Sequence, residues 1–116
     1  MILNGREIGF KYTILSTKEL AKLCPGNDIS KLSEQLQSKD TLKQFETAEK
    51  VIAALNAGYE KAKKFNDPDY IPKPLTLDEL DSLSSDEFGS LLEEALSSMK
   101  EKQTVEAEPI KNAVSP

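Results

Sequence analysis

Residues 41–65, TLKQFETAEKVIAALNAGYEKAKKF, carry the longest regular apolar pattern in the chain. Apolar side chains recur there at intervals of three and four residues, which is the spacing of one face of an α-helix. The members of this stripe are Phe45, Ala48, Ile52, Leu55, Tyr59 and Ala62. A helix of this length would span roughly 37 Å at 1.5 Å per residue. Gly58 interrupts the pattern, and we expect it to mark a close helix crossing.

The residues before this stretch predict a β-hairpin. Asn4-Gly5 is the dipeptide that most readily forms a type I′ turn, because both residues tolerate positive φ. After the turn, Ile8, Phe10 and Tyr12 alternate with Gly and Lys, as in a half-buried strand. We therefore expect a hairpin within the first fifteen residues. A hairpin of this size is marginal in water, so it must pack on helices or join another sheet.

Two short helices are predicted between the hairpin and the long helix. Residues 16–19, Ser-Thr-Lys-Glu, match a capping box that opens the first helix. This helix is expected to end at Cys24-Pro25-Gly26, because proline disfavours helical geometry in the residue before it. Asn27 or Asp28 can cap the second. Its apolar face contains Ile29, Leu32 and Leu36.

The last part of the chain predicts a stiff linker and two more helices. Residues 67–75 are rich in proline, and capping boxes follow at Thr76-Leu-Asp-Glu79 and Ser84-Ser-Asp-Glu87. From 103 onward the apolar pattern fades, which predicts a disordered tail. We thus expect a hairpin and helical domain at 1–66, a linker at 67–75, acidic helices at 76–102 and a tail at 103–116. The predicted fold class is mainly α with a small N-terminal β-hairpin (α+β), a helical bundle of short helices around one long central helix.

Composition disfavours catalysis and zinc binding. The 116 residues include no His, no Trp and a single Cys. The usual general base at neutral pH and the commonest transition-metal ligand are therefore missing. Cys24 has no His to activate it and is interpreted as a packed side chain. Carboxylate pairs such as Glu93-Glu94 are interpreted as solvated helix face, although a carboxylate-only, Mg²⁺- or Mn²⁺-dependent hydrolase stays an open alternative. We expect no enzyme activity, no cofactor and no metal site.

Charge is distributed unevenly along the chain, whose net charge is −5. Residues 75–108 contain ten acids and two lysines, which gives −8, whereas residues 1–74 contain twelve Lys and Arg and ten acids, which gives +2. Neither part forms the strongly basic surface that a phosphate backbone requires, so we expect no nucleic-acid partner. No apolar run is long enough to span a bilayer, and the opening residues lack the pattern of a signal peptide. We therefore expect no membrane partner and a cytoplasmic location.

The apolar stripes indicate binding to another protein. The short helices and the small hairpin offer little surface to cover the long stripe, and a second apolar face lies beyond the linker. An amphipathic helix can occupy a groove in a partner or offer one to it. We assign core or self-association contacts to Phe45, Ile52, Leu55 and Tyr59. Contacts with a partner are assigned to Phe88, Leu91, Leu92 and Met99, since Met adapts well to recognition surfaces.

The sequence resembles the tail assembly chaperones of long-tailed (siphovirus-type) bacteriophages. The resemblance is carried by the opening MILNGREI at 1–8 with the helix start that follows, by VIAALNAGY at 51–59, and by PLTLDEL at 74–80 before FGSLLEEA at 88–95. It covers about residues 1–100. These motifs resemble the opening hairpin, the small-residue-rich central helix and the closing acidic helix of that family.

The resemblance implies a protein that binds the long, helical tape measure protein and keeps it soluble in the bacterial host cytoplasm until the tail tube assembles. It also implies a homo-oligomer. A competing interpretation is a small acidic adaptor or anti-repressor-type regulator that binds a basic protein surface. Salt dependence separates the two, because binding through acidic mimicry weakens steeply as salt is added and apolar binding does not.

Overall fold

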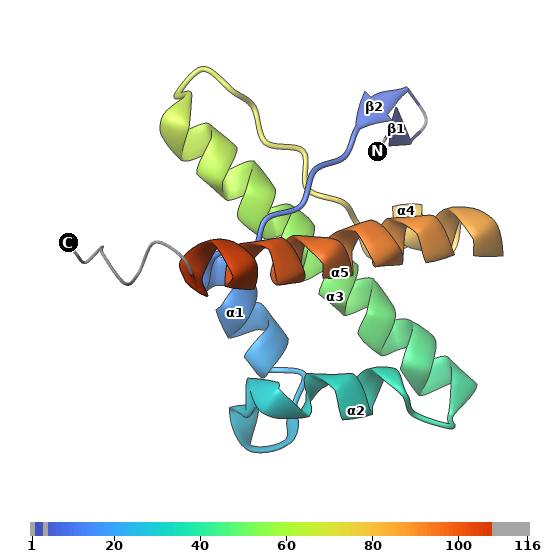
Figure 1. Cartoon of the computed structure of the whole chain (residues 1–116). Helices are drawn as coiled ribbons and strands as arrows, with labels where there is room; N and C mark the ends of the chain where they lie inside the picture. The colour runs from blue at the N-terminus through green and yellow to red at the C-terminus, as the bar shows by residue number, and fades with distance from the viewer. Residues whose placement is uncertain (1, 4, 108–116) are drawn as a thin grey trace.

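The computed structural model describes residues 2, 3 and 5–107, with side chains up to Lys100 (Figure 1). The protein is mainly helical with a two-stranded antiparallel hairpin at its N-terminal end, as predicted. Its elements are β1 (Ile2–Leu3), β2 (Arg6–Glu7), α1 (Ile14–Ala21), η1 (Pro25–Asn27), η2 (Ile29–Lys31), α2 (Leu32–Leu36), α3 (Thr41–Asn66), α4 (Leu77–Asp81) and α5 (Ser85–Ala107).

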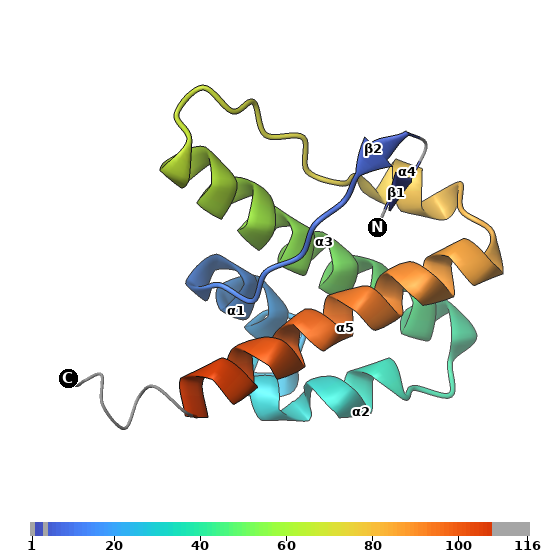
Figure 2. The ribbon, with the colours of Figure 1, turned by 45° about the horizontal axis from the view of Figure 1, so that its top comes forward.

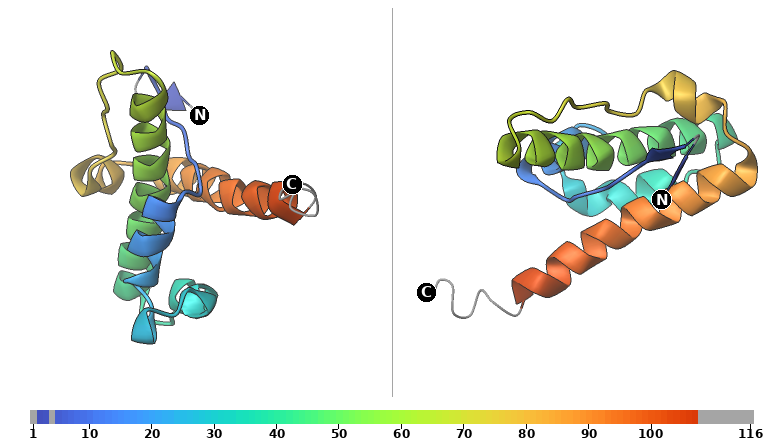
Figure 3. Two further views of the ribbon diagram at one scale, coloured as in Figure 1. Left: turned by 90° about the vertical axis from the view of Figure 1, so that its left-hand side faces the viewer. Right: turned by 90° about the horizontal axis from the view of Figure 1, so that it is seen from above.

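Helix α3 is the central element, and it agrees closely with the helix predicted at 41–65. It begins after Asp40, whose side chain accepts a hydrogen bond from the Lys43 N–H at 3.2 Å. α1 and α5 make its largest helix contacts, followed by α2 and α4. Figure 2 shows α5 crossing over α3, with α1 and α2 beside them. Seen from above in Figure 3, the C-terminal half of α5 diverges from α3.

The β-hairpin is shorter than predicted. Ile2 pairs with Glu7 and Leu3 with Arg6, and β2 ends there. The chain after Glu7 follows α3 instead of extending the strand. The backbone N–H of Lys11 donates to the carbonyl oxygen of Leu55 at 3.0 Å. Ile8 is nevertheless buried as the alternation predicted, and Phe10 and Tyr12 pack against the core.

Helix α1 starts earlier than its predicted capping box. The N-cap is Thr13, whose hydroxyl accepts from the Ser16 N–H at 3.2 Å. The predicted cap, Ser16, is fully buried inside the helix. Its hydroxyl lies 3.0 Å from the carbonyl oxygen of Ala54 and 2.9 Å from that of Lys11. This contact forms beside Gly58, so the close crossing predicted at that glycine is confirmed.

Three further helix starts follow the predicted capping chemistry. Asp28 caps η2 by accepting from the Ser30 N–H at 3.0 Å. Thr76 and Glu79 form a reciprocal capping box at α4, and at α5 Glu87 accepts from the Ser84 N–H at 3.0 Å.

Helix α5 is longer than predicted, because it continues to Ala107 through a stretch expected to begin the disordered tail. Residues 101–107 are mostly good helix formers, and the first strong helix breaker is Pro109. The rest of the predicted tail, 108–116, lies outside the described residues.

Residues 67–75 contain no helix or strand, but they are held against α3 rather than standing free. Two buried polar side chains of α3 bind this segment. Asn56 accepts from the Leu75 N–H at 2.7 Å, and Glu60 accepts from the Lys73 N–H at 2.9 Å. Tyr70 donates its hydroxyl hydrogen to the same Glu60 carboxylate at 2.5 Å. The predicted linker is therefore packed on the helix that precedes it.

One apolar core includes residues from both sides of residues 67–75. Among its most buried members are Leu20 of α1, Ile52 and Leu55 of α3, and Leu91 of α5, each with no exposed surface. The helices on the two sides of residues 67–75 thus bury apolar faces against each other. Less apolar helix surface is therefore left uncovered than we expect from the sequence.

Candidate functional site

An apolar groove lies between α2 and the C-terminal half of α5, and we call it the α2–α5 groove. One wall is formed by Ile29 of η2 with Leu32 and Leu36 of α2, and the other by Leu96 and Met99 of α5. Its volume is about 500 Å³. Leu32 is buried and the other four side chains are half-buried, so the groove presents apolar surface without exposing whole side chains.

The groove exists because α5 diverges from α3 (Figure 3). Phe88, Leu91 and Ala95, in the first half of α5, are buried in the core. Beyond Ala95 the half-buried Leu96 and Met99 border the opening. A helix that is fully packed at one end and partly open at the other leaves room for another apolar segment.

The residues predicted to contact a partner lie in different surroundings. Leu91 is completely buried and Phe88 is 8% exposed, so both serve the core. Leu92 is half-buried against the core but does not line the groove, whereas Met99 does. Of the four, Met99 is placed best for a partner.

The residues predicted for core or self-association divide similarly. Ile52 and Leu55 are fully buried, and Tyr59 is half-buried. Phe45 remains 49% exposed, and its ring lies 5.6 Å from the ring of Phe88, between centroids, at an interplanar angle of 55°. This tilted ring contact links α3 directly to α5. It therefore joins a residue predicted for core or self-association, Phe45, to one predicted for partner binding, Phe88.

Local spacing in the sequence does not show that the two walls of the α2–α5 groove lie side by side in space. The spacing of Ile29, Leu32 and Leu36 predicts an apolar helix face, but it does not show which helix that face meets. Leu96 lies between Leu92 and Met99 at spacings of four and three, and that spacing could have added it to the predicted face. The groove itself depends on how α2 and α5 approach each other in space.

The candidate nucleophile of the sequence, Cys24, occupies a structural position. Cys24 is buried, its Sγ donates to the carbonyl oxygen of Leu20 at 3.5 Å, and burial raises the pKa of its thiol, which disfavours the nucleophilic thiolate. Glu49 of α3 lies near Asp81 of α4. Burial, followed by the neighbouring Asp81 carboxyl, raises the pKa of Glu49 to about 7. Within residues 2, 3 and 5–107 as described, no cluster of three potential ligands could hold a metal ion.

The outer surfaces of α4 and α5 are acidic. Asp78, Asp81, Asp86, Glu87 and Glu93 are all exposed there. Near this surface, the Arg6 side chain pairs with Glu79 at 2.8 Å and also donates to the carbonyl oxygen of Lys73. Arg6 therefore fastens the hairpin to both α4 and the preceding segment. In the part of the chain that the structure describes, no helix has the length and apolar character needed to cross a membrane.

Comparison with models of known protein families, with curated proteins and with solved structures finds no match to this chain.

Proposed function

We propose that this protein is a tail assembly chaperone without catalytic activity, which binds an amphipathic helix of a phage tape measure protein. The observation that carries the proposal is the α2–α5 groove, an open apolar groove between two helices. A helical client can place successive apolar side chains in such a groove at the i, i+3, i+4 and i+7 spacing. Covering the half-exposed Leu96 and Met99 would favour the complex by about 25 cal/mol per Å² of apolar surface removed from water.

The acidic exterior supports the same role. A chaperone must stay soluble while its client is bound, and exposed carboxylates on α4 and α5 supply that solubility. Apolar contacts without a fully enclosed pocket also permit release when the tail tube assembles around the client. We place this activity in the cytoplasm of the bacterial host, where the protein would also associate with copies of itself.

The proposal is tested by co-expressing the protein with a helical fragment of the tape measure protein. Met99→Asp places a carboxylate in the α2–α5 groove, and we expect much less client fragment in the soluble fraction. Ile71→Asp is the control, because Ile71 is 73% exposed and lies outside this groove. Equal recovery of the client with both variants, while circular dichroism shows both to be folded, would contradict the assignment of the groove.

The exposed acids also favour a second candidate, an adaptor that binds a basic protein surface through α4 and α5. Increasing the salt concentration separates the two functions. Client binding through the α2–α5 groove should change little with added salt, whereas binding through Asp86, Glu87 and Glu93 should weaken steeply.

A further inference from the structure

A second groove lies on the side of the molecule formed by α1 and α3, and residues 74, 75 and 77 also contribute to its lining. It consists of two adjoining hollows of about 660 and 600 Å³, which share Leu15 of α1 in their lining. We call the combined surface the α1–α3 groove. Its α3 side carries the small side chains of Ala53, Ala57 and Ala62, which leave space for larger side chains of a partner. None of the side chains that line it belongs to the α2–α5 groove.

Two large apolar side chains border the first hollow and face solvent. Ile14 at the start of α1 is 74% exposed, and Phe65 near the end of α3 is 86% exposed. They are the two most exposed large apolar side chains in the part of the chain that the structure describes. Single exposed apolar residues are common on protein surfaces, but two beside one apolar hollow indicate a surface that becomes covered.

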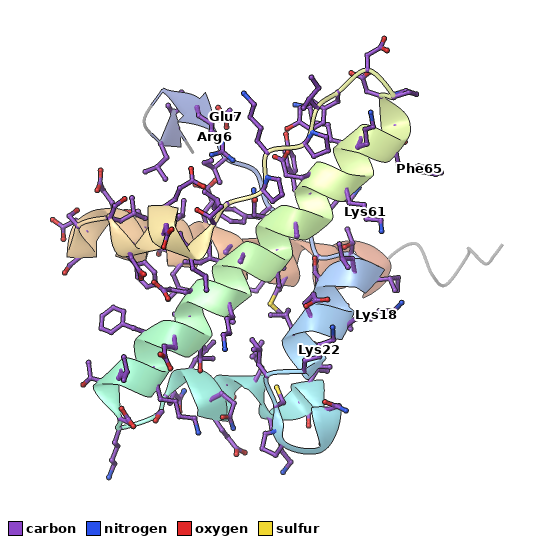
Figure 4. All side chains as sticks on the ribbon, turned by 180° about the vertical axis from the view of Figure 1, so that it is seen from behind. Arg6, Glu7, Lys18, Lys22, Lys61 and Phe65 are labelled. Atoms are coloured by element: carbon purple, nitrogen blue, oxygen red, sulfur yellow. The ribbon has the colours of Figure 1, made fainter. Side chains whose placement is uncertain are left out.

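The α1–α3 groove is bordered by lysines. Lys18 and Lys61 line the first hollow, and Lys22 and Lys50 line the second. Figure 4 shows Lys18, Lys22 and Lys61 on this side of the molecule. The one acid in the lining, Glu19, pairs with Lys22 at 3.2 Å. Within the described residues, Lys18, Lys50 and Lys61 form no ion pair, so the groove carries uncompensated positive charge.

The local positive charge contrasts with the whole chain, whose net charge is −5. A flat anionic membrane or a nucleic acid extends beyond the groove and also meets the field of the acidic helices. One helix lying in the groove meets mainly the lysines, because charges more than about 8 Å away are largely screened at physiological salt. Concave apolar hollows also suit inserted side chains better than a planar surface.

We propose that the α1–α3 groove binds an amphipathic helix of a partner protein whose apolar stripe is flanked by Asp or Glu. The apolar side chains of this helix would enter the two hollows and cover Ile14 and Phe65. Its flanking carboxylates would pair with Lys18 and Lys61. This site is independent of the α2–α5 groove, so the protein can hold two helical segments at once.

The test uses the full-length protein and a fluorescently labelled synthetic helix with a leucine stripe flanked by Glu. A second, comparison peptide is identical except that Lys replaces each Glu. We expect fluorescence anisotropy to show binding of the Glu helix, weakened severalfold by added salt, and much weaker binding of the Lys helix. Lys18→Glu combined with Lys61→Glu should raise the Kd by about tenfold. Phe65→Ser should raise the Kd at every salt concentration.

Matched controls come from exposed residues outside the groove. Lys39→Glu repeats one of the two charge reversals, Ile71→Ser repeats the loss of an exposed apolar side chain, and neither should alter the Kd. Met99→Asp should also leave the Kd unchanged, which separates this site from the proposed chaperone groove.

Three results would overturn the proposal. The first is equal binding of the Glu and Lys helices, or a Kd that changes neither with the double charge reversal at Lys18 and Lys61 nor with Phe65→Ser. The second is self-association of the protein that Phe65→Ser abolishes while the Glu helix does not bind, which would assign the groove to a second copy of the chain. The third is binding to phosphatidylserine vesicles without binding of the Glu helix, which would assign it to a membrane surface.

Discussion

At the scale of single residues, two buried polar side chains of α3 organise segments that are distant in sequence. The Asn56 amide donates to the carbonyl oxygen of Gly9 at 3.0 Å and accepts from the Leu75 N–H at 2.7 Å. One turn further on, Glu60 accepts hydrogen bonds from Tyr70 and Lys73. Buried polar groups require such partners, because burial without a hydrogen bond is costly. These two side chains therefore hold the chain on both sides of α3 in place.

Replacing Asn56 tests this role. Asn56→Ala leaves the carbonyl of Gly9 and the N–H of Leu75 without their partner, and we expect the free energy of unfolding to fall by about 2–4 kcal/mol. Asn66→Ala is the control, because the exposed Asn66 amide bonds only to Ala62 in its own helix. Urea unfolding of both variants measures the difference. Similarly small losses of unfolding free energy in Asn56→Ala and Asn66→Ala would show that Asn56 does not hold these segments.

Gly58 supplies a second prediction at this scale. A Cβ atom at this position would lie 2.6 Å from the Thr13 hydroxyl and 2.7 Å from the carbonyl oxygen of Lys11. Gly58→Ala should therefore destabilise the protein by about 2 kcal/mol, even though alanine is normally the better helix former. In α5, Gly89 has no neighbour within 4 Å of such an atom, so Gly89→Ala should instead stabilise the protein by about 0.5–1 kcal/mol. Thermal unfolding of the two variants should shift in opposite directions.

At the scale of elements, the helices follow local chemistry more closely than the strand does. Helix starts at Thr76 and Ser84 agree with their predicted capping boxes because the bonds of a capping box join residues only three apart. The second strand depends on a partner strand, and in the described part of the chain that partner is Ile2–Leu3. Contacts between elements also depend on tertiary packing, as with the carboxyl groups of Glu49 on α3 and Asp81 on α4.

The raised pKa of Glu49, caused first by burial and then by the Asp81 carboxyl, predicts a pH dependence. The pKa of Glu49 rises from 4.5 to about 7, so between these values the folded protein retains a proton that the unfolded chain has lost. The stabilisation by this proton is complete below pH 4.5 and is lost as the pH rises through about 7. Glu49→Gln should match the original protein near pH 4.5 and be more stable at pH 8, by on the order of 1 kcal/mol after allowing for solvent screening.

Chemical unfolding at several pH values measures this effect. Glu34→Gln on α2 is the control, because Glu34 is exposed and removal of its charge should produce no comparable gain at pH 8. A constant stability difference between Glu49→Gln and the original protein from pH 4.5 to 8 would contradict the raised pKa of Glu49 in the folded protein.

At the scale of the whole molecule, the shared core predicts cooperative unfolding. Leu91 of α5 is fully buried in the same core as Ile52 of α3 and Leu20 of α1. Leu91→Ala should lower the free energy of unfolding by about 2–5 kcal/mol. Hydrogen exchange should show faster opening in α1 and α5 alike. Faster exchange confined to α5 would mean that residues 76–102 unfold as a separate unit. The exposed Leu42 provides the control, since Leu42→Ala should have little effect.

The candidate grooves belong to this largest scale. Local spacing predicted the apolar faces of α2 and α5, including Met99, but not that these faces meet. It likewise predicted the close crossing at Gly58 without showing that Lys18 of α1 and Lys61 of α3 would border one groove. Each groove requires side chains from two elements, and their relative positions result from packing rather than from local sequence.

The sequence by itself determined the mainly helical class, the long central helix and most helix starts. These depend on apolar spacing and capping bonds that act over three or four residues. Only the tertiary structure decided that Phe88 and Leu91 serve the core while Met99 borders a groove. All three lie on one apolar face of α5, and the distinction arises because α5 diverges from α3 along its length (Figure 3). Periodicity identifies a face, but neighbouring helices determine which part of that face remains open to a partner.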